Sequence, residues 1–256
     1  MELTYYIIAM LGSAFAGVVN VLAGNGSTLT LMILTELMGL PGNVANATNR
    51  VGIFTQSASG SWAFYKNGRL GLARSWWYIG ITTLGAIGGI YVATIISDAQ
   101  FRTAFRWLML VTLLILLVKP ERWIRETDVN KQPNWWLAVP MFLAVGFYGG
   151  FIQMGMGIFF LAVMVLGAHF SLTDSNAVKG VVVAIYTLIA IIIFQWNGLI
   201  DWRMGLFMAI GQTLGGYFTA VYAARSPKAN IWAHRMLVVV IILSTIKMFD
   251  LHKIFF

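Results

Sequence analysis

The stretch FYKNGRL at residues 64–70 is followed 130 positions later by a related stretch, FQWNGLI, at residues 194–200. Three further pairs keep the same order at nearly the same spacing: Asn46-Ala47 with Asn176-Ala177, Gly24-Asn25-Gly26 with Gly155-Met156-Gly157, and Ile87-Gly88-Gly89 with Leu214-Gly215-Gly216. The chain therefore consists of two weakly similar halves. In a very apolar chain, such internal duplication is typical of secondary transporters.

The composition is that of a membrane protein. Hydrophobic residues make up 59% of the 256 residues and charged residues 10%, against about 25% charged in ordinary soluble domains. The net charge of +8 comes from cations that stand between apolar runs, so it indicates membrane topology and not nucleic-acid binding. The chain has no Cys, and its three His and nine acidic residues are not clustered. We therefore expect no disulfide, no bound metal and no cofactor.

Apolar runs close to the ~20 residues that cross a bilayer predict an all-α integral membrane protein with roughly eight to ten membrane-embedded helices. We expect an N-terminal repeat at residues 1–118, a polar cytoplasmic linker at 119–134 and a C-terminal repeat at 135–256. The predicted spans are residues 5–23, 44–65, 76–97, 102–118, 135–153, 173–195, 203–224 and 231–249. Two short apolar runs, 28–38 and 158–168, either cross the membrane or re-enter it.

Lys and Arg residues predict how the two halves are oriented, because cytoplasmic connections are rich in them. Residues 66–74 contain three of these cations, whereas the equivalent connection at 197–203 contains one. The two connections are therefore expected on opposite sides of the membrane. This makes the halves inverted repeats and places both chain termini on the non-cytoplasmic side.

Each short run begins at a glycine break, formed by Gly24 and Gly26 in the first half and by Gly155 and Gly157 in the second. Paired, glycine-interrupted segments indicate a substrate site, because broken helix ends are tolerated only inside protein or beside a polar cavity. A freed helix N-terminus also suits an anion. The alternative is close helix packing, which is the role we expect of the glycines inside the long spans: Gly80, Gly85, Gly88, Gly89, Gly211, Gly215 and Gly216.

Two cations support the hypothesis of a site. Arg50 and Lys179 follow Asn46-Ala47 and Asn176-Ala177, and we expect both in the first turns of equivalent helices. Charged residues inside spans tend to face the bundle interior. There both could neutralise a small anion, and Arg50 could make a bidentate contact to an oxyanion. The alternative is that both side chains snorkel to the membrane interface.

Neutral polar side chains at the breaks and beside Arg50 could donate hydrogen bonds to the same anion: Asn20, Asn25, Thr48, Asn49 and Gln153. Ser27 and Thr28 could instead cap the first short helix. Glu36 is the one acid well inside an apolar run. It is either a proton carrier or a residue of the membrane interface.

Several motifs occur together in this chain. The first half contains Gly17-x-x-Asn20-x-x-Ala23-Gly24-x-Gly26, Leu40-Pro41 and Ala45-x-Ala47-Thr48-Asn49, and the second contains Gly146-x-x-Gly149-Gly150-x-x-x-x-Gly155-x-Gly157 and Asn176-Ala177-Val178-Lys179. In combination they resemble the TauE/SafE sulfite exporter family, over both halves of the chain. The chain departs from that family at Val178, where Thr is frequent, and at its second break, which is poorer in glycine.

The resemblance implies a transporter, not an enzyme, that lies in the bacterial inner membrane and moves small sulfur-containing anions such as sulfite, sulfoacetate, another organosulfonate or thiosulfate. It implies that the family's motif residues line the substrate path: Asn20, Gly24, Gly26, Thr48, Asn49, Gly155, Gly157 and Lys179. Asn25, Arg50 and Gln153 are candidates from the residues alone. The alternatives are a membrane-embedded enzyme and a non-transporting membrane subunit. The enzyme would need an acid/base pair or a metal site inside the spans.

Overall fold

The computed structural model describes residues 3–23, 25–66, 74–117 and 133–219, together with residues 235, 238, 239, 241 and 242. Within these residues the chain is helical and forms nine α-helices, which agrees with the predicted all-α class. The predicted linker at 119–134 lies outside the described residues except for its last two. Most of the predicted span at 231–249 also lies outside the described residues.

The first half contains five α-helices. They are α1 (Leu3–Ala23), α2 (Gly26–Met32), α3 (Gly42–Lys66), α4 (Trp76–Ile95) and α5 (Asp98–Leu117), and α2 continues directly into a π-helical turn, η1 (Ile33–Leu37). The second half contains four α-helices. They are α6 (Trp135–Phe151), α7 (Met156–Ala162), α8 (Leu172–Trp196) and α9 (Trp202–Phe218), and α7 continues into the π-helical turn η3 (Val163–Gly167).

The bounds of three elements repeat at a spacing of 130 residues. α2, η1 and α3 have the same lengths as α7, η3 and α8 and begin 130 positions earlier. The turn that follows each short helix contains a residue in the left-handed region at the same spacing, Gly39 with φ 68° and His169 with φ 57°. The spacing of 131 that the glycine pairs give is thus one residue too long, and Gly26 corresponds to Met156.

Among the described residues, three helices are long and apolar enough to cross a membrane, over Leu3–Val21, Trp76–Ile95 and Asp174–Trp196. The pairs α2–η1 and α7–η3 have only twelve residues each. At 1.5 Å per residue they reach about 18 Å, whereas the hydrocarbon core is about 30 Å thick. Neither pair can cross the membrane on its own, so their length supports segments that re-enter the membrane.

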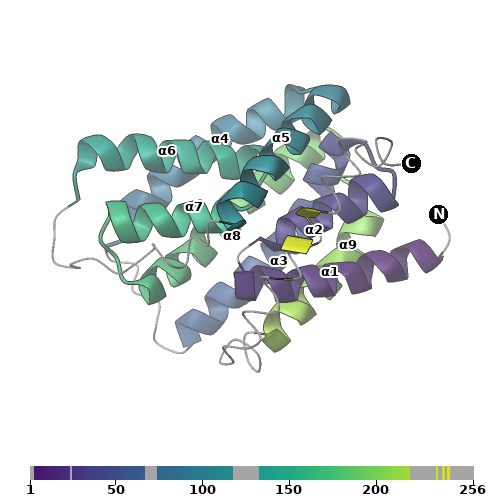
Figure 1. Ribbon diagram of the computed structural model, residues 1–256, viewed down its shortest axis with the longest axis horizontal. Coiled ribbons are helices and arrows are strands. Elements are labelled where there is room, and N and C mark those ends of the chain that lie inside the picture. Colours follow the sequence, from purple (N-terminus) through teal and green to yellow (C-terminus); the bar gives the residue numbers. More distant parts are fainter. Residues whose placement is uncertain are drawn as a thin grey trace.

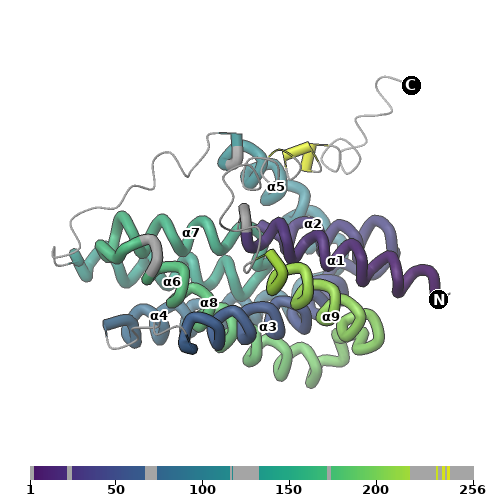
Figure 2. The backbone as a smooth tube through the Cα atoms, turned by 90° about the horizontal axis from the view of Figure 1, so that it is seen from below, coloured from purple at the N-terminus to yellow at the C-terminus, as the bar shows by residue number. Residues whose placement is uncertain are grey.

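The helices form two outer groups with α3 and α8 between them. Figures 1 and 2 show α1, α2 and α9 on one side of the molecule and α4, α6 and α7 on the other. α1 packs most extensively on α9, and α4 on α6. The hairpins α1–α2 and α6–α7 enter from opposite ends in Figure 1, and their breaks come together near the middle.

Glycines allow these outer pairs to approach closely. A Cβ atom on Gly89 would lie 2.0 Å from the carbonyl oxygen of Phe147 in α6, and one on Gly215 would lie 1.9 Å from that of Ala14 in α1. The predicted packing role is confirmed in the same way for Gly85, Gly211 and Gly216. It is wrong for Gly80, where an added Cβ atom would meet no described atom within 4 Å, and for Gly88, where it would lie 3.6 Å from the Phe147 ring, an ordinary contact distance. Both stand on the exposed side of α4.

Large apolar side chains cover the outside of the helix bundle. On α4, Leu84, Tyr91 and Ile95 are 63–66% exposed, and similar residues are exposed on α1, α5, α6 and α9. Soluble proteins rarely expose apolar surface on this scale. These faces are therefore suited to contact with lipid.

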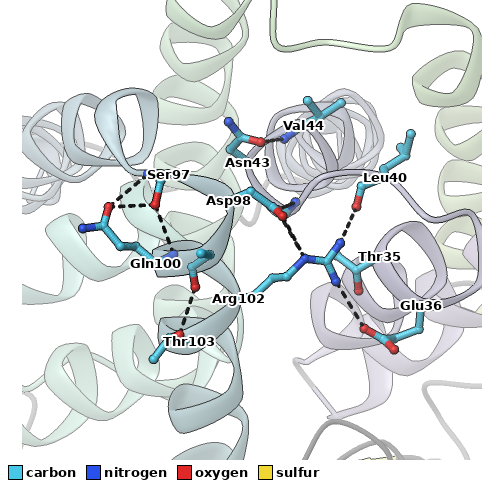
Figure 3. A network of polar contacts seen from close by, with 12 residues as sticks. Thr35, Glu36, Leu40, Asn43, Val44, Ser97, Asp98, Gln100, Arg102 and Thr103 are labelled. Carbon is cyan, nitrogen blue, oxygen red and sulfur yellow. Dashed lines mark hydrogen bonds and ion pairs between the residues drawn. The ribbon is translucent and has the colours of Figure 1, made fainter.

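A polar network fixes the tip of the first hairpin, as Figure 3 shows. The Arg102 guanidinium of α5 lies 3.1 Å from Asp98 Oδ2 and 3.8 Å from Glu36 Oε1, and it donates a hydrogen bond to the Leu40 carbonyl. Asp98 also accepts a hydrogen bond from the Gly42 backbone N–H at the start of α3. Of the two roles considered for Glu36, this ion pair favours the interfacial one.

Candidate functional site

A cavity of about 60 Å³ lies where the two breaks approach each other. A single water needs roughly 10–15 Å³ of such space, so the cavity has room for several waters or a small polyatomic ion. Its lining comes from both breaks and from the two central helices: Asn20, Ser27, Ile53, Ser57, Gln153, Gly157, Lys179, Gly180 and Val183. The closeness of the breaks is visible at Gly155, where an added Cβ atom would lie 3.8 Å from Asn25 Oδ1.

Four of the candidate residues line this cavity: Asn20, Gln153, Gly157 and Lys179. Asn25 and Gly155 lie where the two breaks face each other, but they do not line the cavity. Gly24 lies outside the described residues. Gly26 packs against α1, because a Cβ atom there would lie 2.2 Å from the Ala16 carbonyl oxygen. Thr48, Asn49 and Arg50 lie on α3 before the stretch that reaches the cavity.

Sequence reasoning missed five lining residues: Ser27 as a site residue, Ile53, Ser57, Gly180 and Val183. A helical spacing of four residues relates Ile53 to Ser57 and Lys179 to Val183. The helical period would have pointed from Lys179 to Val183, one turn further along α8. No signal in the sequence shows which face of α3 turns toward these residues.

Lys179 is the cation of the cavity. It stands about two turns inside α8, which begins at Leu172, one residue before the predicted span. Its Nζ donates a hydrogen bond to Asn176 Oδ1 at 2.9 Å. Among the described residues no carboxylate forms an ion pair with it. The cavity therefore has an ammonium group whose charge is not balanced by a described acid.

Arg50 has a different environment. Its side chain is fully buried, which rules out snorkelling, and it too lies about two turns inside its helix. Nη1 donates to the Gly149 carbonyl at 2.8 Å and Nη2 to the Gly150 carbonyl at 2.7 Å. The last carbonyls of a helix have no partner within it and carry partial negative charge. Arg50 thus caps the end of α6 at the second break.

Gly180 occupies the position in α8 that Arg50 occupies in α3, 130 residues earlier. Gly180 has no side chain and lines the cavity, whereas the Arg50 side chain fills the corresponding space beside the second break. The two breaks therefore differ. Arg50 satisfies two carbonyls at the broken end of α6, whereas Gly180 leaves its side of the cavity open, and the cavity itself is lined from both breaks.

Asn20 and Gln56 hold the first break in shape. Asn20 Nδ2 donates to Gln56 Oε1 at 3.0 Å, and Asn20 Oδ1 accepts from the Gly26 N–H at 3.3 Å. Gln56 Nε2 in turn donates to the Gly17 carbonyl at 3.2 Å. The end of α1 and the start of α2 are thus joined through α3.

The other two candidates on α3 have different surroundings. Thr48 Oγ1 accepts a hydrogen bond from the Asp201 N–H at 3.0 Å, just before α9 begins. Asn49 is buried and faces no hydrogen-bond partner among the described residues, and the same holds for the amide of Gln212 on α9.

Comparison with known proteins assigns the chain to a family. Residues 9–248 match the sulfite exporter TauE/SafE family. The chain belongs to the TauE/SafE sulfite exporter family. This is a family of membrane transporters and not of enzymes, and the resemblance noted in the motifs is thereby confirmed.

Two relatives are described as transporters. The chain is 24% identical over 225 residues to a protein of a Sinorhizobium species named "Probable membrane transporter protein ORF9", covering 87% of this chain and 85% of the relative. It is 26% identical over 236 residues to a "Probable membrane transporter protein" of Haemophilus influenzae, covering 91% and 90%. No solved structure matches the chain.

Proposed function

We propose that this member of the TauE/SafE family carries small sulfur-containing anions, of the sulfite, thiosulfate or organosulfonate type, across the bacterial inner membrane. The observation that carries the proposal is the ammonium of Lys179 at the cavity between the two breaks, which forms no ion pair with a described carboxylate. An anion would supply the charge that no described acid supplies, and a half-buried cation inside a membrane protein is costly without a counter-charge.

The remaining lining supports an anion over a cation. Ser27, Ser57, Asn20 and Gln153 bring hydroxyl and amide groups that can donate hydrogen bonds, and no Asp or Glu is among the described residues of the lining. Ile53 and Val183 form an apolar wall beside these donors. A compact oxyanion with or without a small carbon group suits this combination.

Transport proceeds in this proposal by alternating access, as two inverted repeats move around the shared cavity. The support is geometric. The three central elements repeat at 130 residues, and α1 pairs with α9 as α6 pairs with α4. In each such pair the first helix of one half packs on the fourth helix of the other half. A two-fold axis in the membrane plane that relates the two halves would produce this pairing of first and fourth helices.

Flux of ³⁵S-labelled sulfite and thiosulfate into proteoliposomes tests the proposal. Lys179→Ala should lower substrate affinity about tenfold or more, because a charge-assisted hydrogen bond is worth roughly 1.5–3 kcal/mol. Lys66→Ala is the matched control, since Lys66 is exposed at the end of α3 beside Trp62 and far along the helix from the cavity. Flux in the wild type that is equal to that of empty liposomes for every sulfur anion would contradict the proposal and favour a non-transporting subunit.

A further inference from the structure

Gln153 connects the buried Arg50 to the cavity. It lies in the second break, directly after α6, with its backbone in the left-handed region at φ 66°. Its side chain belongs to the cavity lining and is 7% exposed. Gln153 Oε1 accepts two hydrogen bonds, from Arg50 Nη1 at 2.5 Å and from the Tyr186 hydroxyl at 2.8 Å.

The chemistry of Arg50 decides which end of the Gln153 amide turns toward it. A guanidinium group has five N–H donors and no acceptor. The amide oxygen must therefore face Arg50, and the opposite orientation would bring two sets of donors together at 2.5 Å. The Nε2 group makes no hydrogen bond to a described residue and is left on the side of the cavity.

We infer that Gln153 presents its amide N–H₂ to the cavity as a fixed hydrogen-bond donor. Arg50 and Tyr186 are positioning residues that set this orientation by binding the amide oxygen. The inference rests on the proposed anion transport and assigns the means of charge selection. With its oxygen occupied, the amide offers the ligand only donors. The cavity then accepts ligands whose polar atoms are acceptors, and it rejects cations and protonated amines.

This gives Arg50 an indirect part in recognition. The guanidinium donates hydrogen bonds through Nη1 and Nη2 to the Gly149 and Gly150 carbonyls and to Gln153 Oε1. Arg50 is not part of the cavity lining. It does not need to touch the anion. Its charge strengthens the hydrogen bond that orients Gln153, and its buried position keeps that orientation fixed.

Gln153→Glu separates recognition from folding. A carboxylate still accepts from Arg50 and Tyr186, so the melting temperature in detergent should stay equal or rise. The same change removes the donor and adds a negative charge on the cavity side. Binding of thiosulfate and sulfite to the purified full chain should fall at least tenfold. Gln195→Glu is the matched control, since exposed Gln195 likewise accepts a hydrogen bond from Trp202 through Oε1 and lies away from the cavity.

Tyr186→Phe tests the positioning role. It should weaken anion binding in the wild-type background and have no further effect in the Gln153→Glu background, because Tyr186 acts through the amide. Equal losses in both backgrounds would show that Tyr186 acts on the fold, and would overturn its positioning role.

The outcomes separate this inference from the proposed function. Anion binding that depends on Lys179 but is unchanged by Gln153→Glu would overturn the inference and leave the proposed function standing. Binding of another anion, such as nitrate or phosphate, that both Lys179→Ala and Gln153→Glu abolish would support the inference and refute the sulfur substrate. A wild-type protein that binds no anion of this panel would overturn both.

Discussion

Arg50 and Gly180 occupy equivalent positions in α3 and α8, yet they have opposite effects on the space beside them. The Arg50 side chain occupies the region next to the second break and satisfies two carbonyls of α6. Gly180 leaves the region next to the first break open, and Lys179 lies beside it. One substitution between the repeats thus places a buried, hydrogen-bonded side chain in α3 where α8 leaves space that adjoins the cavity.

A side chain at Gly180 should therefore close the cavity. We expect Gly180→Leu to reduce anion flux at least tenfold while the protein still folds, because the nearest atom to an added Cβ is the Ser61 hydroxyl, 2.7 Å away, which can rotate. Flux in proteoliposomes and melting in detergent measure the two effects. Gly80→Leu on the open face of α4 is the control. Undiminished flux in a folded Gly180→Leu protein would place the substrate path elsewhere.

At the scale of elements, small residues decide which helices form the outer pairs. α4 offers a direct comparison, since an added Cβ atom would clash with the backbone of α6 at Gly89 and would meet no described atom at Gly80. Helix association in membranes depends on such close approach because burial of apolar surface gives little driving force there.

Gly89→Ala should lower the free energy of unfolding by about 1–3 kcal/mol, as overpacking does, because its Cβ atom would lie 2.0 Å from the Phe147 carbonyl oxygen. Gly80→Ala should be neutral or stabilising by up to ~1 kcal/mol through helix propensity. Unfolding of the two variants in the same detergent compares them. Equal stability of both would mean that the contact between α4 and α6 can relax without cost.

At the scale of the whole molecule, the repeats predict the topology. The ends of α3 and α8 are equivalent, at Lys66 and Trp196, and the hairpins α1–α2 and α6–α7 enter from opposite ends. If the halves are inverted in the membrane, these two helix ends face opposite compartments.

Cysteine labelling can test this prediction, because the chain contains no Cys. We expect Lys66→Cys to react with a membrane-impermeant maleimide from the cytoplasmic side and Asn197→Cys from the other side. Both positions are exposed at helix ends. Labelling of both from the same side would contradict the inverted arrangement.

The sequence by itself determined the helical membrane class, the two related halves and the two breaks, and among the candidates it proposed are four residues that line the cavity, Asn20, Gln153, Gly157 and Lys179. These features are local or periodic: apolar runs set the helices, and glycines next to short runs set the breaks. The family also followed from motifs within single segments.

The tertiary structure alone decided which groups Arg50 binds and where the cavity lies. The carbonyls that Arg50 binds belong to residues 149 and 150, about a hundred positions away in the chain. A sequence shows that a cation is present inside a helix, but its partners depend on which helix end packs against it. The same reason explains the missed residues Ile53 and Val183, because the face that a helix turns toward a cavity is fixed by its neighbours and not by its own period.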